Sequence, residues 1–121
     1  MKRNWDLIRE VLIEIEELNP AELEAIQYGP ASLSDEPEKD SQAVLLWKAG
    51  FLEGADASSF DGDVVIAREL SWSGHELLDT IRSKAVWERI KSTAQAKGLE
   101  LTFESVKALG RLAWDWVVSQ P

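Results

Sequence analysis

Residues 51–70 have the sequence FLEGADASSFDGDVVIAREL, in which two apolar stretches flank a mostly polar loop. The first stretch spans 51–54, and the second spans 63–70 and contains three consecutive β-branched residues at 64–66. Two such segments joined by a small polar turn are typical of a β-hairpin. Helical patterns lie on both sides of this segment. The sequence therefore predicts a mainly α-helical chain with a small β-hairpin, an α+β fold.

Three helices are expected before the hairpin. Residues 4–18 carry apolar side chains at spacings of three and four, which is typical of an amphipathic helix. The segment Asn19-Pro20-Ala21-Glu22 has the residues of a helix start, so a short second helix is expected to run to Tyr28. A third is expected to begin near Ser34 and to end at Gly50. Three helices followed by a hairpin predict a winged-helix, helix-turn-helix-like core, by analogy with that fold.

Three further helical segments follow the hairpin. One begins at the Ser73–Glu76 capping-box spacing, the next ends at Gly98, and the last spans about 103–118. We expect residues 1–81 to form the winged-helix-like core. Residues 82–121 form a helical extension that packs on the core or makes a dimer interface, as one structural unit. Tryptophans at helical spacing are usually core residues, which is the expectation for Trp5, Trp72 and Trp87.

Charge is unevenly distributed along the chain, whose net charge is −9. Residues 1–61 hold 5 basic and 14 acidic side chains, and residues 62–121 hold 8 of each. A domain that binds DNA non-specifically normally has the opposite sign, so nucleic acid is disfavoured as a partner. The exception is residues 82–97, whose net charge is +4. Its basic residues are Arg82, Lys84, Arg89, Lys91 and Lys97.

Several chemistries are not expected from this composition. The 121 residues include no Cys and 1 His, which argues against thiolate and multi-histidine metal sites. No calcium-loop spacing occurs among Asp56, Asp61 and Asp63. No apolar segment resembles a signal peptide or a membrane span, so we expect a cytoplasmic protein without membrane contact. We expect no cofactor, no metal and no catalytic residues; a general base at His75 oriented by Asp79 is the weakest alternative.

Three stretches resemble a known family. They are residues 1–9 (MKRNWDLIR), 45–54 (LLWKAGFLEG) and 70–79 (LSWSGHELLD). In this order they are similar to the bacterial and phage family called domain of unknown function 2513. The resemblance implies a winged-helix-like fold and an origin in prophages or other mobile elements, and it implies no activity. The third stretch contributes a motif of unknown role, formed by Trp72, Gly74, His75, Glu76 and Asp79.

The last helix is apolar over a broad arc. Trp114 and Trp116 are two residues apart and point to roughly opposite sides of one helix, so they cannot both fill the same small core. An exposed apolar face suggests a partner, and a homodimer is the preferred explanation. The alternative is a helix buried on two sides. The candidate interface residues are Leu112, Trp114, Trp116, Val118 and Trp47.

Two main functions remain open. The preferred one is a non-enzymatic, acidic, winged-helix-like interaction or regulatory module with a protein partner. The alternative is a DNA-binding transcriptional regulator that uses the third helix and the wing. An acid-lined third helix would argue against that alternative. Its candidate contacts are Lys39, Gln42 and Lys48 on the third helix and Arg82, Lys84, Arg89 and Lys91 as a clamp on the DNA backbone.

Overall fold

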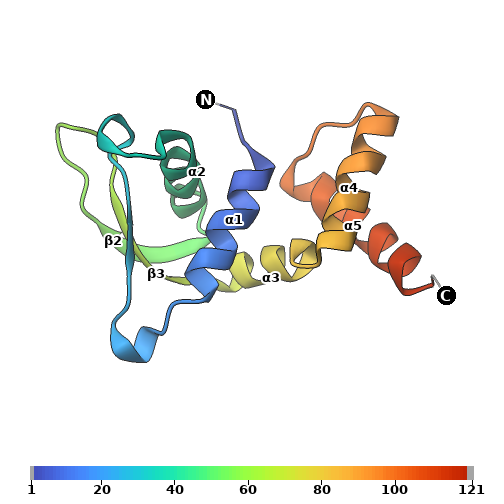
Figure 1. Cartoon of the computed structure of the whole chain (residues 1–121), viewed down its shortest axis with the longest axis horizontal. Helices are drawn as coiled ribbons and strands as arrows, with labels where there is room; N and C mark the ends of the chain where they lie inside the picture. Colours follow the sequence, from blue (N-terminus) through green and yellow to red (C-terminus); the bar gives the residue numbers. More distant parts are fainter. Residues whose placement is uncertain (1, 120–121) are drawn as a thin grey trace. The chain divides into compact units, whose positions relative to one another are not determined.

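The computed structural model describes residues 2–119. The chain divides into two compact units, Met1–His75 and Glu76–Pro121, called the N-terminal and the C-terminal unit below. Residues 2–119 contain five α-helices and one three-stranded antiparallel sheet, so the predicted α+β class is confirmed. The division between residues 75 and 76 lies inside helix α3, Trp72–Ile81 (Figure 1). The core and extension expected to meet at residues 81 and 82 remain a prediction.

Helix α1, Trp5–Glu16, forms where the sequence predicts the first helix. The side chain of Asn4 accepts a hydrogen bond from the backbone N–H of Leu7 at 3.2 Å and so caps the helix. The apolar stripe faces the interior, which removes it from water and stabilises the unit. Its buried members are Ile8, Val11, Leu12 and Ile15.

The expected second helix is not formed, and this prediction was wrong. Asn19 caps only a 3-10 turn, η1, Pro20–Glu22, and Leu23 then adopts a left-handed conformation with φ 58°. The chain continues as strand β1, Ile26–Tyr28, which pairs with β3 through Tyr28 opposite Val65. This pairing buries Tyr28, so a long-range contact outweighs the local helix-start signal.

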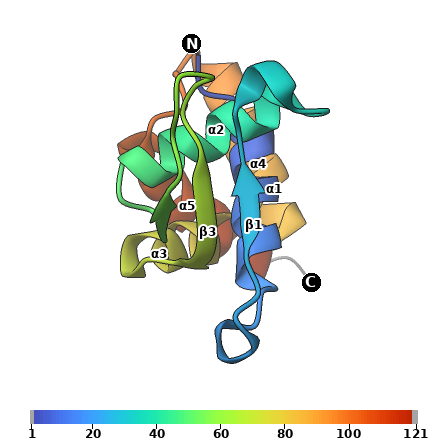
Figure 2. The same ribbon diagram turned by 90° about the vertical axis from the view of Figure 1, so that its left-hand side faces the viewer.

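The predicted hairpin is confirmed. Strand β2, Leu52–Asp56, pairs with β3, Val65–Leu70, with Leu52 opposite Leu70 and a bulge between Glu53 and Gly54. The strand order is β1-β3-β2, so β3 is central and the sheet has one strand more than the sequence predicted (Figure 2).

The third expected helix is also present. It is α2, Pro37–Lys48, and it follows a short 3-10 turn, η2, Ala31–Leu33. Proline occupies the first turn, where no intrahelical donor is lost. The helix buries Ala43, Val44 and Leu46 together with the polar Gln42.

The C-terminal unit consists of the end of α3 and two capped helices, α4, Lys84–Lys97, and α5, Phe103–Val118. Ser83 caps α4, and Thr102 and Ser105 form a capping box at the start of α5. Gly98 ends α4 in the left-handed conformation with φ 65°. Helices α4 and α5 pack against each other. The buried apolar residues of the unit are Leu77, Leu78, Ile81, Val86, Trp87, Ile90, Ala94, Val106, Leu109 and Ala113.

The tryptophans expected in the core differ in their burial. Trp87 is buried as predicted, and Trp5 is half-buried. Trp72 is 80% exposed, so its prediction was wrong. The reason is that α3 begins two residues earlier than the Ser73–Glu76 capping box predicts, so Trp72 is its first residue. The Ser71 hydroxyl, not Ser73, accepts the capping hydrogen bond from Gly74 N–H at 3.1 Å.

Within residues 2–119, none of the helices combines the length and the apolar character that a membrane span requires.

Candidate functional site

Gln42, an expected DNA contact on α2, lies in the interior of the N-terminal unit. Its side chain is 0% exposed. Its Oε1 accepts a hydrogen bond from Asn4 N–H at 2.9 Å, and its Nε2 donates one to the Lys2 carbonyl at 3.0 Å. A buried amide needs such partners, and here they tie the start of the chain to α2. In this position Gln42 is not available to a base edge.

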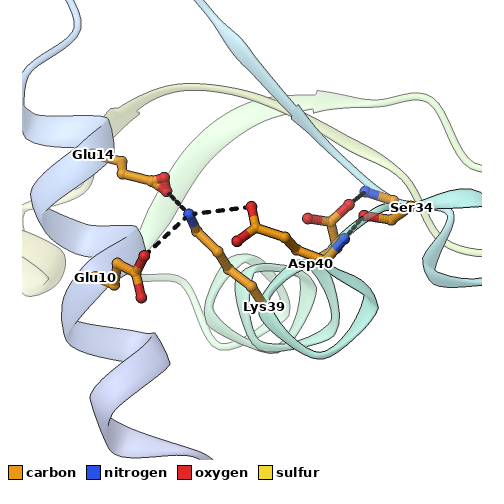
Figure 3. Close-up of polar contacts among 7 residues, drawn as sticks. Glu10, Glu14, Ser34, Lys39 and Asp40 are labelled. Carbon is orange, nitrogen blue, oxygen red and sulfur yellow. Dashed lines mark hydrogen bonds and ion pairs between the residues drawn. The ribbon is translucent and has the colours of Figure 1, made fainter.

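Lys39, the second expected DNA contact, is surrounded by carboxylates (Figure 3). Its Nζ forms ion pairs with Glu14 on α1, with Glu10 at 3.4 Å and with Glu36 at 3.7 Å. The Lys39 side chain is only 12% exposed. Burial by itself would lower the pKa of Lys39. The hydrogen bond and charge of Glu14, helped by Glu10 and Glu36, outweigh burial and raise this pKa above its usual value.

A buried tyrosine adjoins the same carboxylates. The Tyr28 hydroxyl has no hydrogen-bond partner in residues 2–119. Burial raises the pKa of Tyr28, and the charges of Glu14, Asp40, Glu10 and Glu36 raise it further. Asp40 itself accepts a hydrogen bond from Gly29 N–H at 2.8 Å.

We call the four carboxylates around Lys39 and Tyr28 the acidic face. They come from two helices and the N-cap of α2, and they outnumber the single ammonium group that they surround. The acidic face consists of Glu10, Glu14, Glu36 and Asp40.

Lys48, the third expected DNA contact on α2, pairs with the hairpin. Its Nζ lies 2.7 Å from Asp63 Oδ2, and both side chains are more than half exposed. The structure therefore gives both lysines of α2 a carboxylate partner from another element, in addition to burying Gln42. An α2 surface of this kind disfavours phosphate contacts.

The basic residues of the C-terminal unit are more accessible. Arg82 pairs with Asp79 at 3.3 Å, and Lys91 pairs with Glu88 at 3.3 Å, in both cases three positions apart. The guanidinium of Arg89 lies 4.3 Å from the ring centre of Trp116, which is cation–π geometry. Lys84 and Lys97 are exposed on α4.

The candidate interface residues on α5 are exposed. Leu112, Trp114, Trp116 and Val118 all have between 43% and 63% of their surface accessible. Trp47, on α2, is half-buried and belongs to the N-terminal unit. The structure thus groups four of the five candidates on one helix and leaves their dimer role a prediction.

The motif around His75 has two structural features, a glycine at a close backbone approach and acidic residues that line a groove. A Cβ at Gly74 would lie 2.1 Å from the Phe51 carbonyl oxygen, so only glycine fits there. His75 is exposed, and Asp79 pairs with Arg82. Glu76 and Asp79 line an open groove of about 570 Å³ in the C-terminal unit, together with Lys107, Arg111 and Trp114 of α5. Nowhere in the part of the chain that is described do three or more His, Cys, Asp or Glu side chains gather as metal ligands.

Sequence reasoning missed the residues at the tip of the hairpin. Phe60 is fully exposed there, and Leu33 of η2 is exposed as well. A pocket of about 200 Å³ lies between η2, α2 and the hairpin tip, and Asp40, Asp61 and Asp63 are among its lining residues. The available signal was a lone aromatic residue in a turn of small and polar residues.

Comparison with known proteins agrees with the resemblance noted in the sequence. Residues 2–100 match the family described as "Hypothetical protein (DUF2513)". The chain is also similar to an uncharacterized protein of Haemophilus influenzae, 39% identical over 116 residues, which are 92% of this chain and 93% of the relative. Neither description names an enzymatic activity. No solved structure matches the chain.

Proposed function

This chain belongs to the DUF2513 family, and from that premise we propose that it is a non-enzymatic interaction module with a regulatory role, whose acidic N-terminal unit binds a basic protein partner. One observation carries the proposal: Lys39, in the first turn of α2, is enclosed by Glu10, Glu14 and Glu36. The helix that would read DNA thus directs this lysine inward, to carboxylates of its own unit.

The charges of the two units support this direction. The N-terminal unit has 6 basic and 16 acidic side chains, a net charge of −10. The C-terminal unit has 7 basic and 6 acidic side chains, a net charge of +1. A field of this strength repels phosphate and steers basic surfaces toward the N-terminal unit.

The order of elements supports a winged-helix-like interpretation of the N-terminal unit. Helix α1, strand β1, helix α2 and the β2–β3 hairpin follow one another, and β3 is the central strand. In that fold α2 occupies the place of the reading helix and the hairpin is the wing. A mobile-element origin rests on the family resemblance alone. A mobile-element origin would be consistent with an acidic module that occupies the nucleic-acid-binding surface of another protein.

The test is fluorescence anisotropy with two labelled probes, a peptide of nine arginines and a random-sequence DNA duplex, at about 50 mM and about 200 mM salt. We expect the peptide to bind and to weaken with salt, and the duplex not to bind at either salt. Replacing both Glu10 and Glu36 by Gln should weaken peptide binding. Replacing Glu100 and Glu104 by Gln, a matched loss of two carboxylates in the C-terminal unit, should leave it nearly unchanged.

DNA binding is the second candidate, and one observation favours it. Helix α4 exposes Lys84 and Arg89, and residues 82–97, which include this helix, have a net charge of +4. Duplex binding that is tight at low salt and falls steeply with added salt would support this candidate and contradict the first. Weaker duplex binding after Lys84→Gln would then assign the contact to α4.

Self-association through α5 is a further part of the proposal. Its support is the exposed apolar surface of α5, with Leu112 and Trp116 on one side of the helix and Trp114 and Val118 on the opposite side, since a monomer seldom leaves large apolar patches uncovered. Sedimentation equilibrium should show a dimer that Trp114→Ser weakens. A concentration-independent monomer mass would contradict this part and leave the acidic module unaffected.

A further inference from the structure

We propose that a second copy of this chain places its α5 helix in the groove beside Trp114, so that the two α5 helices cross antiparallel about a two-fold axis. This inference rests on the self-association part of the proposed function, because it names the side of α5 that the two copies share. The groove is the one of about 570 Å³ in the C-terminal unit, and it is called the α5 groove below.

The two apolar sides of α5 differ in what already covers them. The ring of Trp116 lies under the Arg89 guanidinium of α4, which is 4.3 Å from the ring centre, so this side is partly used within the unit. Trp114 is 57% exposed and lines the α5 groove. A large exposed aromatic ring beside a groove is typical of an interface anchor, so the Trp114 side is the one open to a partner.

The charges that line the α5 groove fit a second copy of the same surface. An interface across a two-fold axis brings a surface against itself and must therefore be self-complementary. The lining meets this condition, because it includes the cations Lys107 and Arg111 as well as four carboxylates. Asp79 is already paired with Arg82 in its own copy, so the pairing across the axis falls to residues of α5. The four carboxylates belong to Glu76, Asp79, Glu104 and Asp115.

The spacing of residues on α5 sets how the two helices meet. Glu104, Ala108 and Arg111 are four and three positions apart and all exposed, so they lie on one side of the helix. In an antiparallel crossing with the axis between Lys107 and Ala108, Glu104 of one copy lies opposite Arg111 of the other. The small side chain of Ala108 lets the helices approach at the crossing. Trp114 of each copy then reaches the start of the other α5.

The net charges of the two units favour a second copy as the occupant of the α5 groove. Two N-terminal units, each with a net charge of −10, repel each other. The C-terminal unit has a net charge of +1, so two copies meet no such barrier when they approach through this unit. A basic partner, in contrast, is drawn to the N-terminal unit by its larger charge. The α5 groove is therefore the surface where the chain meets its own copy.

The first test is sedimentation equilibrium of the full chain and of two matched tryptophan variants. Trp114→Ser should raise the dissociation constant of the dimer at least about tenfold, because it removes the aromatic anchor of the α5 groove. Trp116→Ser makes the same change on the other side of the same helix and should raise this constant less than about threefold. Circular dichroism checks that both variants keep their helices.

The second test exchanges charges between the copies. Arg111→Glu and Glu104→Lys each place like charges opposite each other at both crossing contacts of the dimer. Each variant alone should therefore sediment as a monomer at a concentration where the wild type is a dimer. In an equal mixture both contacts again join opposite charges, so the dimer mass should return. This recovery distinguishes a contact between copies from a loss of folding, since one misfolded variant would not restore another.

Each outcome decides the inference. A dimer that Trp116→Ser weakens as much as Trp114→Ser does would overturn the α5 groove as the interface and leave self-association in place. Charge variants that remain dimers on their own, or a mixture that stays monomeric, would overturn it as well. A wild-type chain that is a monomer at every concentration would remove self-association itself. Binding of the nine-arginine peptide is measured separately, so none of these results is confused with a failure of the acidic module.

Discussion

The N-terminal and the C-terminal unit use their basic side chains differently. In the N-terminal unit, Lys39 reaches Glu14 on another helix and Lys48 reaches Asp63 beyond the β2 strand. In the C-terminal unit, Arg82 and Lys91 pair with carboxylates only three residues away. The largely buried Lys39 contact joins two helices of the fold, whereas exposed ion pairs contribute little to stability. A count of charges along the sequence therefore does not tell which cations remain available to a partner.

A leucine-to-alanine change in each unit gives the largest contrast. Leu12 is fully buried in α1, so Leu12→Ala should lower the free energy of unfolding by about 2–5 kcal/mol. Leu112 is exposed on α5, and Leu112→Ala should change it by less than about 0.5 kcal/mol. Urea unfolding followed by circular dichroism measures both values. Equal losses would contradict the burial of one leucine or the exposure of the other.

Lysine removal tests whether a cation belongs to the fold. Lys39→Met leaves Glu10, Glu14 and Glu36 without their shared counter-ion, and should lower the free energy of unfolding by about 1–3 kcal/mol. Lys84→Met removes an exposed cation of α4 and should change it by less than about 0.5 kcal/mol. The same unfolding experiment compares them. A Lys39→Met protein as stable as the wild type would show that the acidic face does not need its lysine.

Two buried glycines, Gly110 in the C-terminal unit and Gly74 in the N-terminal unit, test how tightly each unit is packed. A Cβ at Gly110 would lie 2.4 Å from Cγ2 of Thr80, so Gly110→Ala should lower the free energy of unfolding by about 1–3 kcal/mol. Adding Thr80→Ser removes that methyl group and should restore most of the loss. At Gly74 the obstacle is the backbone oxygen of Phe51, and no side-chain change can remove it. Failure of Thr80→Ser to rescue Gly110→Ala would contradict the close approach of α3 and α5.

Alkaline pH should affect the N-terminal unit through Tyr28 and Lys39. Both groups have a raised pKa in the folded chain, from ordinary values of 10.0 and 10.5. Their stabilisation is present below these values and is lost as the pH rises through the folded pKa. Tyr28→Phe removes a hydroxyl that has no hydrogen-bond partner within residues 2–119, so at neutral pH it should change stability by less than about 1 kcal/mol.

Urea unfolding between about pH 8 and about pH 11 provides the measurement. The Tyr28→Phe variant should lose less stability over this range than the wild type, with the remaining loss due to Lys39. Identical pH dependence of the two proteins would contradict the buried, ionisation-resistant tyrosine.

The sequence predicts those parts of the fold that depend on local spacing. Helix α1, the β2–β3 hairpin, α4 and α5 follow from apolar periodicity and caps within each segment. Strand β1 could not be predicted, because its three residues are held by pairing with β3, nearly 40 positions further along the chain. The sequence pattern at Asn19 correctly predicts a helix cap. The helix that Asn19 caps is only a 3-10 turn of three residues.

The candidate site was less predictable than the fold. Charge counting correctly located the acidic excess, yet Lys39 looked like an available cation because Glu10 and Glu14 are more than 20 residues away in sequence. Gln42 looked like a polar surface residue because its partners, Asn4 and Lys2, meet it only after folding. The spacing of residues within α2 indicates neither the enclosure of Lys39 nor the burial of Gln42.

The most direct measurement is a competition between this protein and DNA for a basic ligand. A labelled duplex is first saturated with the nine-arginine peptide, and the full chain is then added while the anisotropy of the duplex is followed. An acidic module that binds basic partners should remove the peptide, and the anisotropy should fall to that of free duplex. A rise in anisotropy, or no change at saturating protein, would mean that the chain binds DNA or leaves the basic ligand alone, and would contradict the account.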